Sequence, residues 1–286
     1  MTLRDWIREH NLLAFGLIAF GWTWGWDGIF YVLGLWELIP VSIPRVWGPA
    51  IAAVIIIWAS DISLRTWIRR RLDWRVPPGL FLLALMIPLF ITNVQPVVEA
   101  LGGGSLVYNP PVAVDPAVAF ALAVVFVVVN MFVLGGTEEI GWRGIMQPRL
   151  QHQMSVFTAG LTIGAVWWAW HLPLFFTGDP NYSLEIEPFL SYTLFVLGSS
   201  TVLGAFVNLT EGNVLPVMLM HASVNLGAFI AADGGILEGS ALVPLLVGAG
   251  LWWILAGLLI ARYGLSMTPK SDLTPLSSRT VAQPGD

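Results

Sequence analysis

Polar residues interrupt the apolar stretches of this 286-residue sequence at four places. The most informative is the segment TEEIGWRG, in which Glu138 and Glu139 are adjacent and Arg143 follows Glu139 by four residues. This spacing predicts a helical ion pair between Glu139 and Arg143, whereas Glu138 points about 100° away around the helix. We therefore expect one structural carboxylate and one that is free to act as a base. The alternative is that both carboxylates only cap a helix in contact with water.

Two of the four histidines, His171 and His221, lie in apolar stretches. His221 and Asn225 are one helical turn apart and share a face. The chain turns near Ser155, and Glu138 precedes this turn by about as many residues as His171 follows it, so the two can lie at a similar depth. A single histidine in an apolar helix is often only a hydrogen-bonded packing residue. Two of them on separate helices, together with the glutamate pair, favour a functional site.

Asp27, in the segment GWTWGWDGIF, is the remaining ionisable residue within an apolar stretch. It could be a proton-relay group, but its glycine and tryptophan neighbours favour a solvated or helix-breaking residue near a membrane interface. We interpret the fifteen tryptophans mostly as interfacial and lipid-facing anchors, not as parts of a cofactor site.

A glutamate, two histidines and an asparagine are sufficient for hydrolysis. The glutamate would activate a water molecule, and imidazole and amide donors would stabilise the oxyanion. Alternatively, Glu138, His171 and His221 would hold a zinc ion that acidifies its bound water. The chain has no cysteine, so thiolate nucleophiles and thiolate metal sites are excluded. Neither a His-Glu-x-x-His nor a His-x-x-Glu-His pattern is present to favour zinc.

The composition predicts an all-α, polytopic integral membrane protein. Hydrophobic residues make up 56% of the chain, charged residues 11%, and the mean hydropathy is +0.76. Apolar stretches long enough to cross a bilayer predict about eight transmembrane helices. They cover residues 12–36, 42–60, 78–98, 116–136, 156–176, 189–209, 214–231 and 241–261.

The distribution of basic residues predicts that both termini are cytoplasmic and that the protein is a multi-pass protein of the cell membrane. With eight spans, every arginine and lysine except Arg45 falls on one side. The arginine-rich segment 61–76 would be either a helix in the headgroup layer or a simple cytoplasmic loop. Residues 1–262 form the predicted membrane domain, and residues 263–286 form a predicted disordered tail because they lack apolar periodicity.

Three short motifs resemble those of the CPBP intramembrane proteases, also called the Abi or CAAX prenyl-protease family, which are related to Ras-converting endopeptidases. They are the E-E-x-x-x-R of Glu138, Glu139 and Arg143, the aromatic-x-x-x-His of Trp167 and His171, and the His-x-x-x-Asn of His221 and Asn225. The resemblance covers a motif core at about residues 137–226. Trp167 stands where the family usually has phenylalanine, and we expect it to preserve only an aromatic wall.

The resemblance implies an intramembrane endopeptidase in which Glu138 activates water. Glu139 and Arg143 would be the pair that orients Glu138. His171 would be a second water-polarising group or a ligand, and His221 and Asn225 would be oxyanion donors. Both a zinc-dependent and a metal-free glutamate mechanism are compatible with this family. The implied substrates are peptides or lipidated proteins. Members of the family include CAAX endopeptidases that remove the last three residues of a prenylated C-terminus, and bacterial proteins linked to bacteriocin processing or self-immunity.

Two other function classes compete with the protease. A proton-coupled transporter would use the same ionisable residues as a relay. A non-catalytic membrane scaffold would keep the fold and bind a partner protein. The arginine cluster follows from membrane orientation, so no nucleic-acid partner is expected, and nothing in the sequence indicates an oligomeric state.

Overall fold

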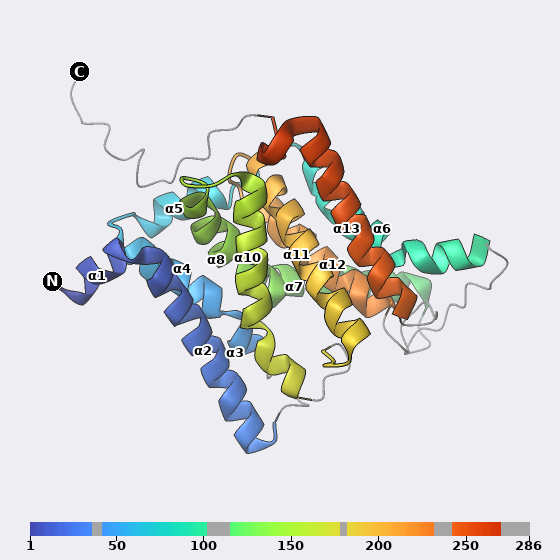
Figure 1. The fold of residues 1–286 in the computed structure, drawn as a ribbon, viewed down its shortest axis with the longest axis horizontal. Helices are drawn as coiled ribbons and strands as arrows, with labels where there is room; N and C mark the ends of the chain where they lie inside the picture. Colours follow the sequence, from blue (N-terminus) through green and yellow to red (C-terminus); the bar gives the residue numbers. More distant parts are fainter. Residues whose placement is uncertain (36–41, 102–114, 178–181, 232–241, 270–286) are drawn as a thin grey trace.

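The computed structural model describes residues 1–35, 42–101, 115–177, 182–231 and 242–269, and in these ranges the chain forms helices and no strand (Figure 1). The all-α prediction is therefore confirmed. The α-helices are α1 (Leu3–Glu9), α2 (Asn11–Leu33), α3 (Ser42–Val46), α4 (Gly48–Ala59), α5 (Leu64–Arg71), α6 (Pro78–Leu101), α7 (Pro116–Phe132), α8 (Glu138–Gly141), α9 (Gln147–Leu150), α10 (Val156–Trp170), α11 (Ile186–Leu209), α12 (Leu215–Ala231) and α13 (Leu242–Tyr263). Short 3₁₀ turns occur at η2 (Gly135–Thr137), η4 (Leu172–Phe176) and η5 (Gly264–Ser266), and a π-helical turn at η3 (Trp142–Met146).

Each of the eight predicted spans contains a helix, and the second contains two α-helices, α3 and α4. Four helical segments of the described chain are long and apolar enough to cross a membrane, and three further apolar helices are shorter. The four are Pro116–Leu150, Val156–Phe176, Pro188–Leu209 and Val247–Ser266, and the three are Ile43–Ala59, Pro78–Val94 and Leu215–Gly227. This supports a helical membrane protein, while the count of eight spans and the cytoplasmic termini stay predictions.

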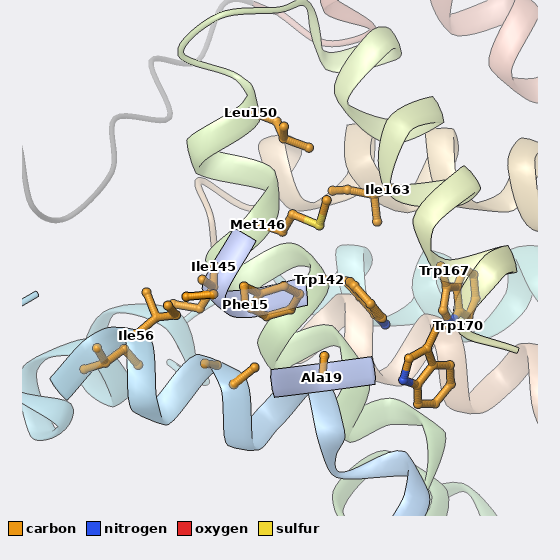
Figure 2. Close-up of a cluster of buried hydrophobic side chains, with 14 of the residues drawn as sticks. Phe15, Ala19, Ile56, Trp142, Ile145, Met146, Leu150, Ile163, Trp167 and Trp170 are labelled. Carbon is orange, nitrogen blue, oxygen red and sulfur yellow. The ribbon is translucent and has the colours of Figure 1, made fainter. Parts of the chain in front are cut away.

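Helix α10 lies near the middle of the molecule, with α2 and α4 on one side and α11 to α13 on the other (Figure 1). A first hydrophobic cluster joins α2, α4, η3 and α10, and its aromatic centre is Trp142, which packs between Phe15 and Trp170 (Figure 2). A second cluster joins α6, α11, α12 and α13 around Trp252, and a third joins α7 to α12. The helices that carry the predicted motifs therefore belong to one packed bundle.

The arginine-rich segment contains the helix α5, not a simple loop. Trp67 is buried and packs beside Gly144, whereas Arg65, Arg69 and Arg70 are exposed. Arg71 donates a hydrogen bond to the carbonyl of Gly212 at 3.0 Å. This contact ties α5 to the turn between α11 and α12.

The first residues of the predicted tail are structured. Helix α13 ends at Tyr263, η5 follows, and the side chains of Met267 and Thr268 are buried. Residues 270–286, which make up the rest of the predicted tail, lie outside the described residues.

Glycines allow the close approaches that place the glutamate pair. A Cβ atom on Gly136 would lie 2.6 Å from the Cα of Met131, so only glycine permits the 3₁₀ turn η2 after α7. A Cβ atom on Gly141 would lie 2.6 Å from the Cβ of Pro49, at the contact between α8 and α4. Close packing therefore fixes the chain just before α8 and at the end of α8.

We predict that Gly141→Ala destabilises the protein by about 1–3 kcal/mol, because the added methyl group overpacks this contact. Gly25→Ala is the matched control, since nothing lies within 4 Å of a Cβ at that position in α2. The control is expected to be neutral or slightly stabilising. Thermal unfolding in detergent measures both, and equal midpoints for the two variants would contradict the packing argument.

Candidate active site

The two glutamates of the first motif begin α8 and are buried, with exposed fractions of 3% for Glu138 and 0% for Glu139. Glu139 forms the predicted ion pair with Arg143, with 2.9 Å between Oε2 and Nη1. Its other oxygen, Oε1, lies 2.7 Å from Nδ1 of His221. Because a carboxylate only accepts hydrogen bonds, Nδ1 carries the proton and donates it. Glu139 thus joins the first motif to the third.

Arg143 extends this network to two further helices. Its Nη2 donates to Oγ of Ser200 at 2.9 Å, and Oγ of Ser200 donates to the carbonyl of Gly160 at 2.7 Å. Ser200 lies on α11 and Gly160 on α10, so the guanidinium links α8 and η3 to both. These acceptors offset part of the cost of removing the guanidinium from water.

Glu138 is held differently, by indole donors. Nε1 of Trp167 donates to Oε2 of Glu138 at 2.8 Å, and Nε1 of Trp142 reaches the same oxygen at 3.4 Å. Within the described part of the chain, the second oxygen, Oε1, accepts no hydrogen bond, and Glu138 lines a cavity. A carboxylate fixed at one oxygen and open at the other is suited to take a proton from water.

Tryptophans therefore do more at this site than the sequence analysis expected. Trp142, Trp167 and Trp170 are buried in the first cluster and are not lipid-facing anchors (Figure 2). We expected Trp167 to supply only an aromatic wall, but its Nε1 makes a hydrogen bond that phenylalanine cannot make.

His221 and Asn225 project from α12 toward the turn η2. A Cβ atom on Gly135 would lie 2.8 Å from Nε2 of His221 and 2.6 Å from Nδ2 of Asn225, so the glycine leaves room for both nitrogens. Nδ2 of Asn225 donates one hydrogen to Oδ1 of Asn130 at 3.0 Å, which orients the amide. Its second hydrogen is available to a ligand. With Nδ1 protonated, Nε2 of His221 is an acceptor in the neutral ring and a donor only in the imidazolium form.

His171 follows the last residue of α10, and its Nδ1 donates to the carbonyl of Trp167 at 2.9 Å. The rings of Trp170 and Tyr182 surround it, with centroids at 4.7 Å and 6.0 Å. The Nδ1 bond makes Nε2 an acceptor in the neutral ring, so His171 can orient a water molecule.

A cavity of about 250 Å³ brings four predicted site residues together. They are Glu138, His171, His221 and Asn225, whereas Glu139 and Arg143 lie behind this surface and contact its residues. Tyr182, Tyr192 and Phe195 add an aromatic wall. The geometry thus separates residues that face the cavity from residues that hold them.

The sequence analysis missed Arg45 and misjudged Asp27. Asp27 is not solvated: it is 3% exposed, and its Oδ1 accepts a hydrogen bond from Nε of Arg45 at 2.8 Å. Arg45 lines the cavity. The sequence did contain a signal for this pair. Arg45 is the single basic residue on its side of the predicted eight-span arrangement, and a charge near the membrane needs a partner such as Asp27.

The predicted zinc ligands do not form a metal-binding group in this structure. In the part of the chain that the structure describes, no three histidine, aspartate or glutamate side chains come together closely enough to hold a metal ion. Catalytic zinc sites commonly have three protein ligands. We therefore derive no step through zinc, and zinc-dependent and metal-free water activation stay two alternatives that chelation can separate.

Comparisons with known proteins point to the same segment. Residues 120–227 match the family described as type II CAAX prenyl endopeptidase Rce1-like, and this segment contains all three motifs. The chain is also similar to CAAX prenyl protease 2 of Methanococcus maripaludis, with 28% identity over 102 residues. That alignment covers 33% of this chain and 36% of the relative, so the chain spans about a third of the length of the curated relative it matches. The resemblance to the CAAX prenyl-protease family is confirmed over this segment.

The buried network makes a prediction about stability. Arg143→Met leaves Glu139 buried without its cation, and we expect the free energy of unfolding to fall by about 3–5 kcal/mol. The double variant Glu139→Gln with Arg143→Met removes both charges and should recover much of this loss.

The control is Arg8→Met. The Arg8 side chain is 52% exposed in its ion pair with Asp5, so its loss should lower the free energy of unfolding by less than about 1 kcal/mol. Unfolding in detergent, followed by circular dichroism, compares the three variants. A double variant no more stable than Arg143→Met would show that charge pairing is not the source of the effect.

Proposed function

We propose that this protein is an intramembrane endopeptidase of the CAAX prenyl-protease type, which hydrolyses a peptide bond close to a membrane surface. The observation that carries the proposal is the position of Glu138, whose one oxygen is fixed by Trp167 while its other faces a cavity shared with His171, His221 and Asn225. The match of residues 120–227 to the Rce1-like family supports the same assignment.

The reaction begins with a water molecule between Glu138 and the scissile carbonyl. Oε1 of Glu138 takes a proton from this water while its oxygen attacks the carbonyl carbon. His171, with Nε2 as an acceptor, orients the same water by receiving its second hydrogen. The carbonyl π electrons move to the oxygen, and a tetrahedral oxyanion forms.

Asn225 and His221 face this oxyanion. Nδ2 of Asn225 donates its second hydrogen, and Nε2 of His221 donates in the imidazolium form, which Glu139 stabilises through Nδ1. Collapse of the intermediate breaks the C–N bond, and the proton held by Glu138 passes to the departing nitrogen. The products are a new carboxyl terminus and a peptide with a free amine.

A lipidated substrate agrees with the membrane location of the site. A prenyl chain partitions into the bilayer and keeps the attached peptide at the membrane surface, which raises its local concentration near an embedded cavity. The name of the relative from Methanococcus maripaludis, a CAAX prenyl protease, supports this substrate class.

Cleavage of a prenylated CAAX-type peptide by the purified protein in lipid tests the proposal. Glu138→Gln should lower kcat by about 10²–10⁴, because it removes the base and keeps the size of the side chain. Glu9→Gln, a change of an exposed glutamate in α1, is the matched control and should leave the rate unchanged.

Prolonged chelation of the wild-type enzyme then separates the two water-activating mechanisms. Undiminished cleavage supports the glutamate mechanism, whereas a loss that zinc restores assigns water activation to the metal. A folded wild-type protein that cleaves neither this peptide nor a broad peptide library would overturn the protease assignment in favour of a scaffold or a transporter.

The bond from Trp167 to Glu138 makes a separate prediction. Trp167→Phe keeps the aromatic wall and deletes one hydrogen bond to a charged group, so kcat should fall about 10- to 100-fold with KM little changed. Trp168→Phe is the matched control, since Nε1 of Trp168 makes no hydrogen bond within the described chain. Equal kcat values for the two variants would show that Trp167 does not position the carboxylate.

A further inference from the structure

A second pair of buried charges lies at the cavity and has no part in the mechanism above. Asp27 on α2 and Arg45 on α3 are 3% and 6% exposed. Two hydrogen bonds connect them, from Nε to Oδ1 at 2.8 Å and from Nη2 to Oδ2 at 3.3 Å. Oγ1 of Thr23 also donates to the carbonyl of Arg45 at 2.7 Å, so α2 holds α3 at two points.

Asp27 occupies only one edge of the guanidinium. An arginine has five N–H donors arranged in a planar fork, and Asp27 accepts from the edge formed by Nε and Nη2. Within the described residues, Nη1 donates no hydrogen bond, and the side chain lines the cavity. The edge formed by Nη1 and the second hydrogen of Nη2 is therefore available to another acceptor.

The orientation of Arg45 is fixed on a further side. Its Cζ lies 4.8 Å from the ring centroid of Trp170, a cation–π contact within the first hydrophobic cluster. A guanidinium held by a carboxylate and by an indole loses little entropy when it binds a ligand. Apolar residues of similar volume often replace a buried ion pair without loss of stability, so packing alone does not account for a buried ion pair at this cavity.

We propose that Arg45 binds the C-terminal carboxylate of the peptide substrate, with Asp27 and Trp170 as positioning residues. This inference rests on the proposed function and extends it to substrate selection. Arg45 is the only arginine or lysine among the described residues that line the cavity. The fork of a guanidinium matches the two oxygens of a carboxylate, and such paired hydrogen bonds are strong in a site shielded from water.

The dimensions agree with this role. A protease that releases the last three residues must hold the scissile bond and the terminal carboxylate at the same time. Three extended residues span at most about 11 Å, so both sites must lie within one small cavity. Glu138 and Arg45 line the same cavity, of about 250 Å³, so both side chains can face one peptide end. Binding the terminal carboxylate would distinguish a chain end from an internal peptide segment.

The test uses two prenylated peptides of the same sequence, one with a C-terminal carboxylate and one with a C-terminal amide. Kd is measured with the Glu138→Gln protein in lipid nanodiscs, and kcat/KM with the protein that retains Glu138. The acid should bind about 10- to 100-fold more tightly than the amide. The decisive variant is Asp27→Asn with Arg45→Gln, which removes both charges and leaves no unpaired ion buried.

In this double variant the acid and the amide should bind about equally well, so the ratio of their affinities should fall to about one. The change should come from a weaker Kd and a higher KM for the acid, while kcat for the amide stays the same. Arg45→Lys, which keeps the charge but loses the fork, should retain only part of the preference. Arg71→Gln is the matched control, since Arg71 is a buried arginine that does not line the cavity, and it should keep the wild-type ratio. Unfolding midpoints establish that each variant is folded.

Each outcome has a definite meaning. A folded double variant with the wild-type ratio would overturn the inference, and so would a protein with Arg45 intact that binds both peptides equally. Cleavage without any preference would leave the proposed protease standing and remove only the carboxylate site. Preferential binding of the acid through Arg45 without cleavage of either peptide would overturn the protease and leave the carboxylate site standing.

Discussion

A charge that is buried among apolar helices must be paired, and this constraint determines how the site is assembled. Arg143 and Glu139 are both fully buried, so each needs partners on neighbouring helices. The resulting chain of contacts runs from the carbonyl of Gly160 through Ser200, Arg143 and Glu139 to His221. It joins α10, α11, η3, α8 and α12, and all of these except η3 contribute residues to the lining of the cavity. Side-chain hydrogen bonds thereby fix helices whose apolar faces alone would allow them to slide.

This network leaves Glu138 in a distinct environment. Adjacent carboxylates would repel each other, but Glu139 shares its charge with a guanidinium and an imidazole, while Glu138, among the residues that the structure describes, accepts hydrogen bonds only from neutral indoles. The π-helical turn η3 begins directly after α8 and contains Trp142, which contacts Glu138, and Arg143, which contacts Glu139. Such turns often mark functional sites because the extra residue redirects side chains. The division between a structural and an open carboxylate is therefore a property of the local backbone as well as of the partners.

The sequence predicted what depends on local spacing. A helix in each of the predicted apolar stretches follows from hydropathy, and the pair of Glu139 with Arg143 follows from a separation of four residues. The contact of Trp167 with Glu138 could not be predicted, because it joins residues that are 29 apart in the sequence. Nothing in the sequence distinguishes a tryptophan whose indole binds a carboxylate from one that only packs. Asp27 was misjudged for a similar reason. Its partner Arg45 lies 18 residues away on another helix, so no helical spacing connects them. Pairs between helices require the packing of the bundle, which hydropathy alone does not specify.

Two fixed points in a small cavity impose a rule on what can be cleaved. If Glu138 attacks and Arg45 anchors, the distance between them determines how many residues separate the scissile bond from the chain end. Selection by length then needs few side-chain contacts, and the aromatic wall of Tyr182, Tyr192 and Phe195 can accept varied apolar residues between the two points. Aromatic and aliphatic packing discriminates weakly between similar side chains, by about 1–3 kcal/mol per methylene. An internal peptide segment, by contrast, has no carboxylate at that position and would leave the open edge of Arg45 desolvated without a partner. The cost of leaving those N–H donors without an acceptor, more than any side-chain contact, would restrict cleavage to chain ends.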